Sequence, residues 1–221
     1  MQVQIDHVVI AGSDLAALRA QSEAHGLPPV EGGVHVGGQT HNALVSFPDG
    51  TYLELIAPTP GNTAPDHVWT EFMHTEAGVC AWAIRSTNLE ADTALYRLRG
   101  ISVSDPVSGG RTRTDGVRLD WRTARLGDDP LGSVLPFLIQ DVTPRDLRVP
   151  KPAGGYEKIA GIECVVCGVS DENDPILALL KRAFDAELIT DNAGLRLGNE
   201  PIRFDTTPGK HGLRDMRLRS R

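Results

Sequence analysis

The chain has 221 residues, of which 40% are hydrophobic and 23% charged, a composition typical of globular proteins and not of disordered or fibrous ones. Its formal net charge is −7, from 22 Lys and Arg against 29 Asp and Glu, which argues against a nucleic-acid partner because such binding needs a basic face. No run approaches the roughly 20 apolar residues of a membrane span, so we expect no membrane partner.

The first predicted unit covers residues 1–60 and consists of a strand, a helix and three more strands. The β-branched run "IDHVVIA" (5–11) predicts the first strand, and the helical segment after it ends at Gly26, a residue suited to the left-handed position that follows a helix. An extended segment surrounds Val30. Residues 41–57 then contain two strand-like runs joined by Pro-Asp-Gly, which indicates a hairpin.

The opening phrase recurs twice along the chain, which predicts an internal repeat. Residues 5–14 match residues 162–171 closely, and the same phrase matches residues 79–89 more weakly. We therefore expect a second βαβββ unit at 78–145 and a third, shortened unit at 158–206. The candidate N-cap residues of the three helices are Ser13 or Asp14, Thr87 or Asn88, and Ser170 or Asp171.

The segments between and after the units have the composition of loops. We expect a connector at 61–77, a linker at 146–157 and a basic, solvated tail at 207–221. The predicted fold class is α+β, with repeated βαβββ units forming a curved mixed sheet, helices outside it and a third, partial unit. That third unit could cover an exposed sheet edge or take the place of a second subunit.

Two polar residues interrupt the apolar strands of the first unit, His7 in the first strand and Glu54 in the last. A carboxylate inside "YLELIA" is costly unless it is paired or coordinated, and strand alternation places it on one face with Tyr52 and Ile56. If the two strands are neighbours, His7 and Glu54 form half of an open site for a divalent metal. The simpler interpretation is a satisfied core histidine and a glutamate at a solvent-exposed edge.

Other residues could line the same cleft. The glycine-rich segment 31–42 brings polar side chains to the start of a strand, although an ordinary hairpin connection explains it equally well. Arg111 and Arg113 stand beside a turn, where a guanidinium could bind a carboxylate or phosphate; solvent exposure is the alternative, favoured for Arg111. Two tryptophans could wall an apolar pocket or simply belong to the core. The candidate substrate-binding residues are His35, Thr40, Asn42, Trp82, Arg113 and Trp121.

The repeated units, with "IDHVVIAGSDL", "HVGGQTHNALVSFPDGTYLELIAP" and "LPFLIQDVTP", resemble the glyoxalase-like branch of the vicinal oxygen chelate superfamily over residues 3–145. The resemblance implies a curved sheet of two βαβββ units and a divalent metal (Mn, Fe, Co, Ni or Zn) bound by residues of the first and last strands. The matching positions here are His7 and Glu54. The second unit offers no full ligand set, so His41, Gln140 or water would have to complete the shell.

Two functions remain open from the sequence. The first is a divalent-metal-dependent enzyme of lyase, isomerase or dioxygenase type, in which a metal on His7, Glu54 and His41 would bind the vicinal oxygens of a small substrate. His7 and Glu54 are the catalytic candidates, and Glu54 could instead be a general base whose pKa the sheet environment raises. The second is a metal-free protein that binds or sequesters a small drug-like molecule in the same cleft, as antibiotic-resistance members of the superfamily do.

Cellular location and assembly are predicted from weaker signals. The three cysteines are too few for a disulfide framework, and the chain does not open with a secretory signal pattern, so we expect a cytoplasmic protein. A small molecule is the expected partner, and a homodimer is among the expected assemblies.

Overall fold

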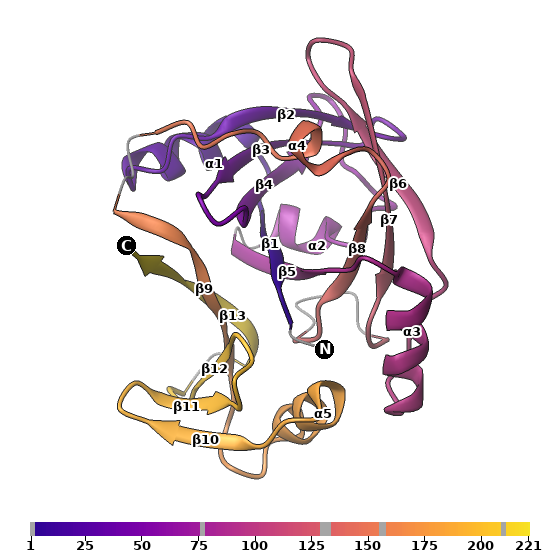
Figure 1. The fold of residues 1–221 in the computed structure, drawn as a ribbon. Helices are drawn as coiled ribbons and strands as arrows, with labels where there is room; N and C mark the ends of the chain where they lie inside the picture. Colours follow the sequence, from indigo (N-terminus) through magenta and orange to yellow (C-terminus); the bar gives the residue numbers. More distant parts are fainter. Residues whose placement is uncertain (1–2, 76–77, 129–133, 155–157, 209–210) are drawn as a thin grey trace.

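In the part of the chain that the structure describes, eight strands close into a barrel, and five more form a separate sheet beside it (Figure 1). The structure is a computed structural model that describes residues 3–75, 78–128, 134–154, 158–208 and 211–221. The first unit contains β1 (Ile5–Ala11), α1 (Leu15–Ala24), β2 (Val30–His35), β3 (Thr40–Ser46) and β4 (Tyr52–Pro58). The second contains β5 (Gly78–Arg85), α3 (Leu89–Leu98), β6 (Val107–Thr112), β7 (Arg118–Arg125) and β8 (Phe137–Asp141).

The first strand of each unit lies parallel to the last strand of that unit, and the two first strands join the units. β1 pairs with β4 in parallel and with β5 in antiparallel orientation, and β5 pairs with β8 in parallel. The barrel order is β1-β4-β3-β2-β6-β7-β8-β5. Leu15 and Leu18 of α1 pack on the outer side of β3 and β4, and α3 also lies outside the barrel (Figure 1). The predicted α+β class with repeated βαβββ units in a curved mixed sheet is confirmed.

The three main helices begin at side-chain caps that satisfy free N–H groups of the first turn. The caps are Asp14, Asn88 and Asp174, whose side chains accept hydrogen bonds from the N–H groups of Ala17, Ala91 and Ile176. The first two agree with the prediction. The third helix, α5 (Pro175–Phe184), has Pro175 in its first turn, but Asp174 caps it in place of the predicted Ser170 or Asp171.

The C-terminal sheet contains a full βαβββ unit and one additional strand. The unit consists of β9 (Ile159–Gly168), α5, β10 (Leu188–Asp191), β11 (Gly194–Leu197) and β12 (Ile202–Asp205). The strand order is β10-β11-β12-β9-β13, in which β13 (Gly212–Ser220) lies antiparallel to β9. The predicted solvated tail at 207–221 is therefore wrong for Gly212–Ser220. β13 covers the open edge of β9 in the way that β5 covers β1.

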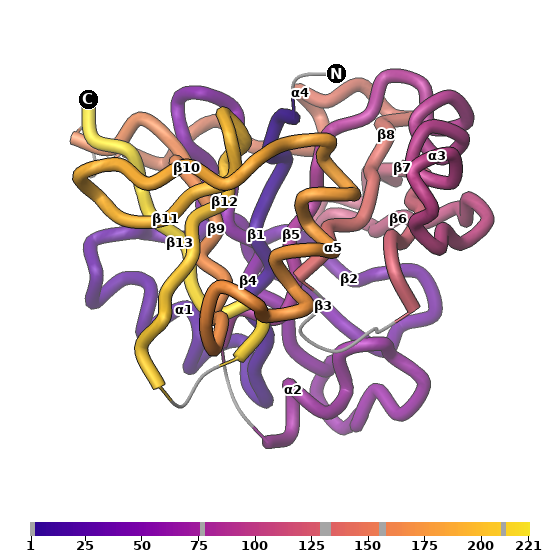
Figure 2. Tube along the Cα trace, turned by 90° about the horizontal axis from the view of Figure 1, so that it is seen from below, coloured from indigo at the N-terminus to yellow at the C-terminus, as the bar shows by residue number. Residues whose placement is uncertain are grey.

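One hydrophobic core joins the barrel to the C-terminal sheet, which lies beside β1 and β5 (Figure 2). Trp82 of β5 packs against Phe184 of α5, with their ring centroids 6.2 Å apart, and Val165 of β9 belongs to the same core. The C-terminal sheet thus buries an outer face of the barrel. The connecting segments carry two short helices, α2 (Thr70–His74) and α4 (Arg145–Arg148). No helix in the described part of the chain is long and apolar enough to cross a membrane.

Candidate active site

A cavity of about 360 Å³ lies inside the barrel, lined by strands of both units and by the segment that leads into α2. This volume suits a small molecule. Its polar side chains include His7, His35, Thr40, Glu54, His67 and Arg111, and its apolar wall includes Ile56, Trp69, Trp121 and Phe137.

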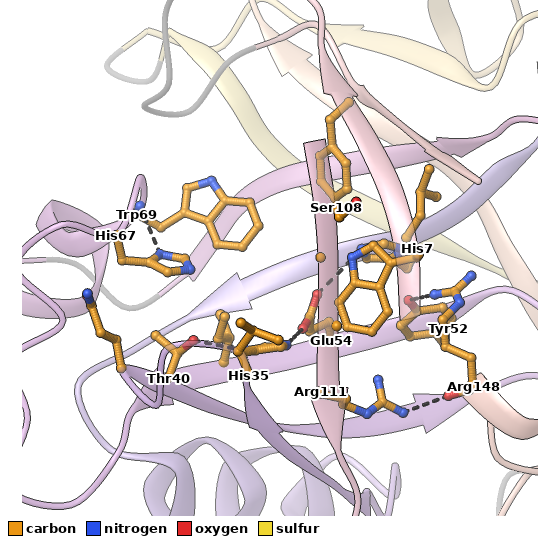
Figure 3. Close-up of a pocket in the computed structure, with 18 of the residues that line it drawn as sticks. His7, His35, Thr40, Tyr52, Glu54, His67, Trp69, Ser108, Arg111 and Arg148 are labelled. Atoms are coloured by element: carbon orange, nitrogen blue, oxygen red, sulfur yellow. Dashed lines mark hydrogen bonds and ion pairs between the residues drawn. The ribbon is translucent and has the colours of Figure 1, made fainter. Parts of the chain in front are cut away.

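Glu54 of β4 lies between two imidazoles (Figure 3). Its Oε2 is 3.4 Å from His7 Nε2, and its Oε1 is 3.4 Å from His35 Nε2. The side-chain amide of Asn42 also donates to Oε1, at 2.6 Å. Glu54 is only 8% exposed, and a carboxylate so deeply buried would destabilise the barrel if these partners were missing.

A β-bulge sets the orientation of His7. The register of β1 against β5 shifts between Ile5 and His7, so Asp6 is an extra residue in β1. His7 Nδ1 lies 2.8 Å from Asp6 Oδ1, and its Nε2 is thereby directed at Glu54 (Figure 3). The His7 ring also stacks on Tyr52, with the ring centroids 4.5 Å apart. The bulge, the carboxylate and the stacked ring together hold the imidazole in one orientation.

The second imidazole, His35, is held at the end of β2. Thr40 Oγ1 lies 2.9 Å from its Nδ1, and the Trp121 ring meets it edge to face at a centroid distance of 6.2 Å. β2 can approach the site closely because residue 32 is glycine: a Cβ at Gly32 would lie 2.0 Å from Asn42 Oδ1. A larger residue there would displace the amide that supports Glu54.

The pKa of Glu54 lies well below its usual range, opposite to the direction expected from the sequence. Burial acts to raise this pKa, but the hydrogen bonds and charges of His35 and His7 outweigh burial. For His7, burial acts to lower the pKa, but Asp6 and Glu54 outweigh it and raise the pKa above its usual value. At neutral pH the site therefore favours an imidazolium between two carboxylates.

Below this pair, Asp6 is fully buried against arginines of α4. Arg148 Nη2 lies 3.2 Å from both carboxylate oxygens of Asp6, and Arg145 forms an ion pair with the same carboxylate. Arg148 also donates to the Tyr52 hydroxyl at 2.6 Å and pairs with Asp141. Arg148 is 2% exposed and lines the cavity, so the predicted linker contributes to the site.

Arg111 of β6 lines the cavity as well, although the sequence favours exposure to solvent at this position. It is 3% exposed. Its Nε donates to the Gly32 carbonyl at 3.1 Å and its Nη2 to the Arg148 carbonyl at 2.6 Å (Figure 3).

Six of the predicted site residues lie together. His7, His35, Thr40, Glu54 and Trp121 line the cavity, and Asn42 contacts Glu54 from behind. Trp82 and Arg113 lie elsewhere. Trp82 is fully buried in the outer core, where its Nε1–H donates to the Val134 carbonyl, because successive residues of β5 point to opposite sides. Arg113 follows the end of β6 and pairs with Asp115 in an exposed turn.

The two additional ligands considered for a metal also lie outside the cavity. His41 faces a groove beside α1, because its neighbour Asn42 points inward and alternate residues of a strand face opposite sides. Gln140 accepts a hydrogen bond from the Leu89 N–H and donates to the Thr87 carbonyl, so it supports the start of α3.

The repeat identifies the residues of the second unit that replace His7 and Glu54. Val9 pairs with Glu54 in the first unit, and its equivalent Ala83 pairs with Phe137 in the second. Phe137 therefore stands at the position of Glu54, and Ala81 stands at that of His7. Both are apolar.

Two further cavity residues, His67 and Trp69, come from the connector before α2. Burial lowers the pKa of His67 to about 4, so this imidazole is neutral at pH 7. No periodic pattern in the sequence marks either residue, because they reach the cavity through a loop.

The donors in the cavity do not fit a divalent metal. In the described part of the chain, no group of three or more His, Cys, Asp or Glu side chains is placed to hold a metal ion. The second unit supplies Ala81 and Phe137 where further ligands would stand. One oxygen of Glu54 already accepts the hydrogen bond from Asn42.

We expect the free energy of unfolding to be greatest near pH 6.5, because neutral His67, whose pKa is lowered to about 4, contributes fully only above about pH 6.5 and loses that contribution as pH falls toward 4. Asp6 and Glu54 have lowered pKa values, so their contribution is present above about pH 4, the unfolded value, and is lost as pH falls through the folded values. His7 has a raised pKa, so its contribution is full below about pH 6.5 and is lost as pH rises through the folded value.

Urea unfolding between pH 4 and pH 9 measures this dependence. His7→Gln should flatten the alkaline decline, whereas His25→Gln, at an exposed position after α1, should leave it unchanged. An equal alkaline decline in wild type and His7→Gln would contradict the assignment.

Two βαβββ units, joined through their first strands around a cavity, define a protein of the vicinal oxygen chelate fold. The sequence model of a family described as "Glyoxalase-like domain" matches residues 5–184, most of the chain, and the protein belongs to this family.

Several solved structures are similar to this chain. A hypothetical protein from Staphylococcus aureus is 16% identical with a TM-score of 0.71, and the match covers 95% of this chain and 88% of that one. A variant of methylmalonyl-CoA epimerase from Streptomyces coelicolor is 23% identical, with coverages of 65% and 100% and a TM-score of 0.47. Methylmalonyl-CoA epimerase from Mycobacterium tuberculosis is 21% identical, with coverages of 63% and 88% and a TM-score of 0.44. None of the curated proteins compared with the chain matches it.

Proposed function

We propose that this protein is an enzyme that moves a proton on a small substrate with two neighbouring oxygen atoms, in an isomerase or lyase type of reaction. The observation that carries the proposal is the buried carboxylate of Glu54 with one imidazole at each of its oxygens. A carboxylate can remove a proton from a carbon next to a carbonyl, and imidazoles can stabilise the oxyanion that forms.

Each side chain of the site would have its own role in the reaction. Glu54 takes the proton, the electrons of the C–H bond move to the carbonyl oxygen, and His7, held by Asp6, donates to that oxygen. His35 is positioned for the neighbouring oxygen. Return of the proton to the other face of the carbon gives an isomer, and departure of a β-substituent gives a lyase product.

Substrate binding would also make Glu54 a stronger base. In the free protein, contacts with His7 and His35 lower its pKa. When both imidazoles bind substrate oxygens instead, burial dominates and the pKa of Glu54 rises toward the range in which proton removal is efficient. The low pKa in the free protein is therefore compatible with a catalytic base.

Sequestration of a drug-like molecule is the second candidate. The apolar wall of Trp69, Trp121 and Phe137 favours it. A site that only sequesters an apolar molecule does not need a buried imidazolium and carboxylate, which are costly to desolvate. The enzyme is the better supported function for this reason.

Deuterium exchange tests the proposal. The full chain is incubated in D₂O with hydroxyacetone, pyruvate and phenylpyruvate, and incorporation at the carbon next to the carbonyl is followed by NMR. We expect at least one compound to exchange faster with the protein than without it, and to do so when EDTA has removed free metal. Binding without exchange would favour sequestration.

The metal-dependent form of the function predicts a different result. Exchange would then require added Mn, Fe, Co, Ni or Zn, and near-stoichiometric metal would be lost in both His7→Ala and Glu54→Ala. That outcome would overturn the metal-free mechanism and restore the ligand set expected from the sequence.

A further inference from the structure

We propose that the ligand of this cavity is a small organic carboxylate with an apolar substituent, its carboxylate bound by Arg111 and its apolar part seated in a groove beyond Phe137. This inference rests on the proposed function, because it takes the barrel cavity to be the substrate site. Two independent features of the structure carry it, a buried guanidinium and an adjoining apolar groove.

The first feature is the state of Arg111. The two acceptors of its guanidinium, the carbonyls of Gly32 and Arg148, are both uncharged. Among the described residues, no carboxylate lies within ion-pair distance of Arg111, although it is 3% exposed. Arg148 beside it is different, because Asp6 and Asp141 both pair with it.

A buried charge without an opposite partner destabilises a fold, so the missing anion is expected to come from the ligand. A guanidinium has five N–H donors, and the two carbonyls that hold Arg111 leave others free. The carbonyls also fix its plane, which suits an oxyanion bound through two parallel hydrogen bonds.

The charge balance favours a carboxylate over a phosphate. Arg111 offers one positive charge, and the ionised Glu54 lines the same cavity. A monoanion is neutralised by the guanidinium, whereas a dianionic phosphate would leave an excess negative charge facing Glu54. A carboxylate also supplies one of the neighbouring oxygens that the proposed chemistry uses.

The second feature is an apolar groove of about 400 Å³ that shares Trp69 and Phe137 with the cavity. Its lining includes Ala81, Leu126, Leu135 and Pro136, and Val68 and Val107 lie partly exposed at its surface. Ala81 and Phe137 are the equivalents of His7 and Glu54. The two halves of the barrel thus differ in chemistry: the first unit supplies His7, His35 and Glu54, and the second supplies Arg111 and an apolar surface.

An apolar substituent of the ligand fits this arrangement. A molecule whose carboxylate lies at Arg111 and whose reacting carbon lies at Glu54 extends toward Phe137, which forms the boundary of the groove. Burying an aryl or alkyl group there contributes binding free energy in proportion to the apolar area removed from water.

Calorimetric titration of the full chain with four probes tests the inference without turnover. The probes are 3-phenylpropanoate, propanoate, 3-phenylpropanamide and phenyl phosphate. We expect 3-phenylpropanoate to bind at least about tenfold more tightly than propanoate, because propanoate lacks the ring. It should exceed the amide by a similar factor, because the amide lacks the charge. Equal or tighter binding of phenyl phosphate would overturn the carboxylate assignment, and equal binding of the amide would overturn the role of Arg111.

Variants locate the two parts of the ligand. Arg111→Met should weaken 3-phenylpropanoate about tenfold or more and leave the amide unchanged, whereas Arg113→Met, in the exposed turn, should change neither. If Arg111→Met does not fold, Arg111→Lys can replace it. Lysine keeps the positive charge but lacks the paired N–H donors of the guanidinium, so this variant should weaken binding of 3-phenylpropanoate and leave binding of the amide unchanged. No change in either Arg111 variant would overturn the inference.

A variant and a matched control test the role of the groove. Val107→Asp places a charge at the groove and should weaken 3-phenylpropanoate but not propanoate. Val117→Asp, exposed in the turn between β6 and β7, should affect neither probe. An equal effect of the two variants would remove the groove from the ligand site.

Failure of this inference differs from failure of the proposed function. Glu54→Gln should slow deuterium exchange about 10²- to 10⁴-fold and yet retain carboxylate binding, because it removes a negative charge from the cavity. Binding that follows Arg111 with no exchange in any compound would reject the enzyme and keep the carboxylate site. Exchange at the wild-type rate in the Arg111 variants would reject the carboxylate site and keep the enzyme.

Discussion

Glu54→Gln is expected to slow deuterium exchange about 10²- to 10⁴-fold, the range by which a positioned general base accelerates proton transfer. Glutamine keeps the shape of the side chain and can still accept a hydrogen bond from Asn42, so the barrel should remain folded. It cannot take a proton at neutral pH. The measurement is the initial rate of exchange by NMR at equal protein concentration.

The matched control is Glu31→Gln, which removes an exposed carboxylate of β2 that pairs with Arg19. It should leave the exchange rate unchanged. The loss of Glu54 should also lower the pKa of His7, since one of the two carboxylates that raise it is gone. Exchange at the wild-type rate in Glu54→Gln would show that the base is another group.

Arg148→Met should reduce the free energy of unfolding by about 3–5 kcal/mol, the cost of breaking a buried ion pair by removing one partner. Arg148 is 2% exposed and holds Asp6, Asp141 and the Tyr52 hydroxyl together. Its loss leaves the carboxylate of Asp6, itself fully buried, with weaker compensation from Arg145. Urea unfolding at pH 7 measures the change.

Arg122→Met provides the comparison, because Arg122 pairs with Glu90 on the protein surface. A surface ion pair contributes little, so this variant should unfold at nearly the wild-type midpoint. In Arg148→Met, the pKa of Asp6 should also rise toward its unfolded value, so the part of the acid-induced loss of stability that comes from Asp6 should become smaller. Similar midpoints for the two arginine variants would contradict the buried network.

Alignment of the repeated units indicates more about which residues face the cavity than the strand pattern alone. The strand pattern predicts His7 and Glu54 together, because each is a polar residue in an apolar strand of one unit. The same repeat also excludes Trp82 from the cavity: it aligns with Val8, one residue after His7, and so belongs on the opposite face of its strand.

Arg111 and Arg113 could not be separated by this reasoning. Residues two apart in a strand share a face, so both are equivalent in the pattern. β6 ends at Thr112, and the chain then turns outward, so only Arg111 enters the barrel. Where a strand ends depends on its pairing partners, and these lie in other parts of the chain.

The sequence by itself determined the repeated βαβββ units, the α+β class and the choice of His7 and Glu54 as the polar residues of their strands, because alternation, helix caps and the repeat can be read along the chain. Only the tertiary structure decided that Arg148 lies beneath the site, that Phe137 faces Glu54's half of the barrel, and that β13 covers β9. Each of these depends on closure of the sheet, which brings residues from distant segments into contact. Strand register and burial are set by that closure.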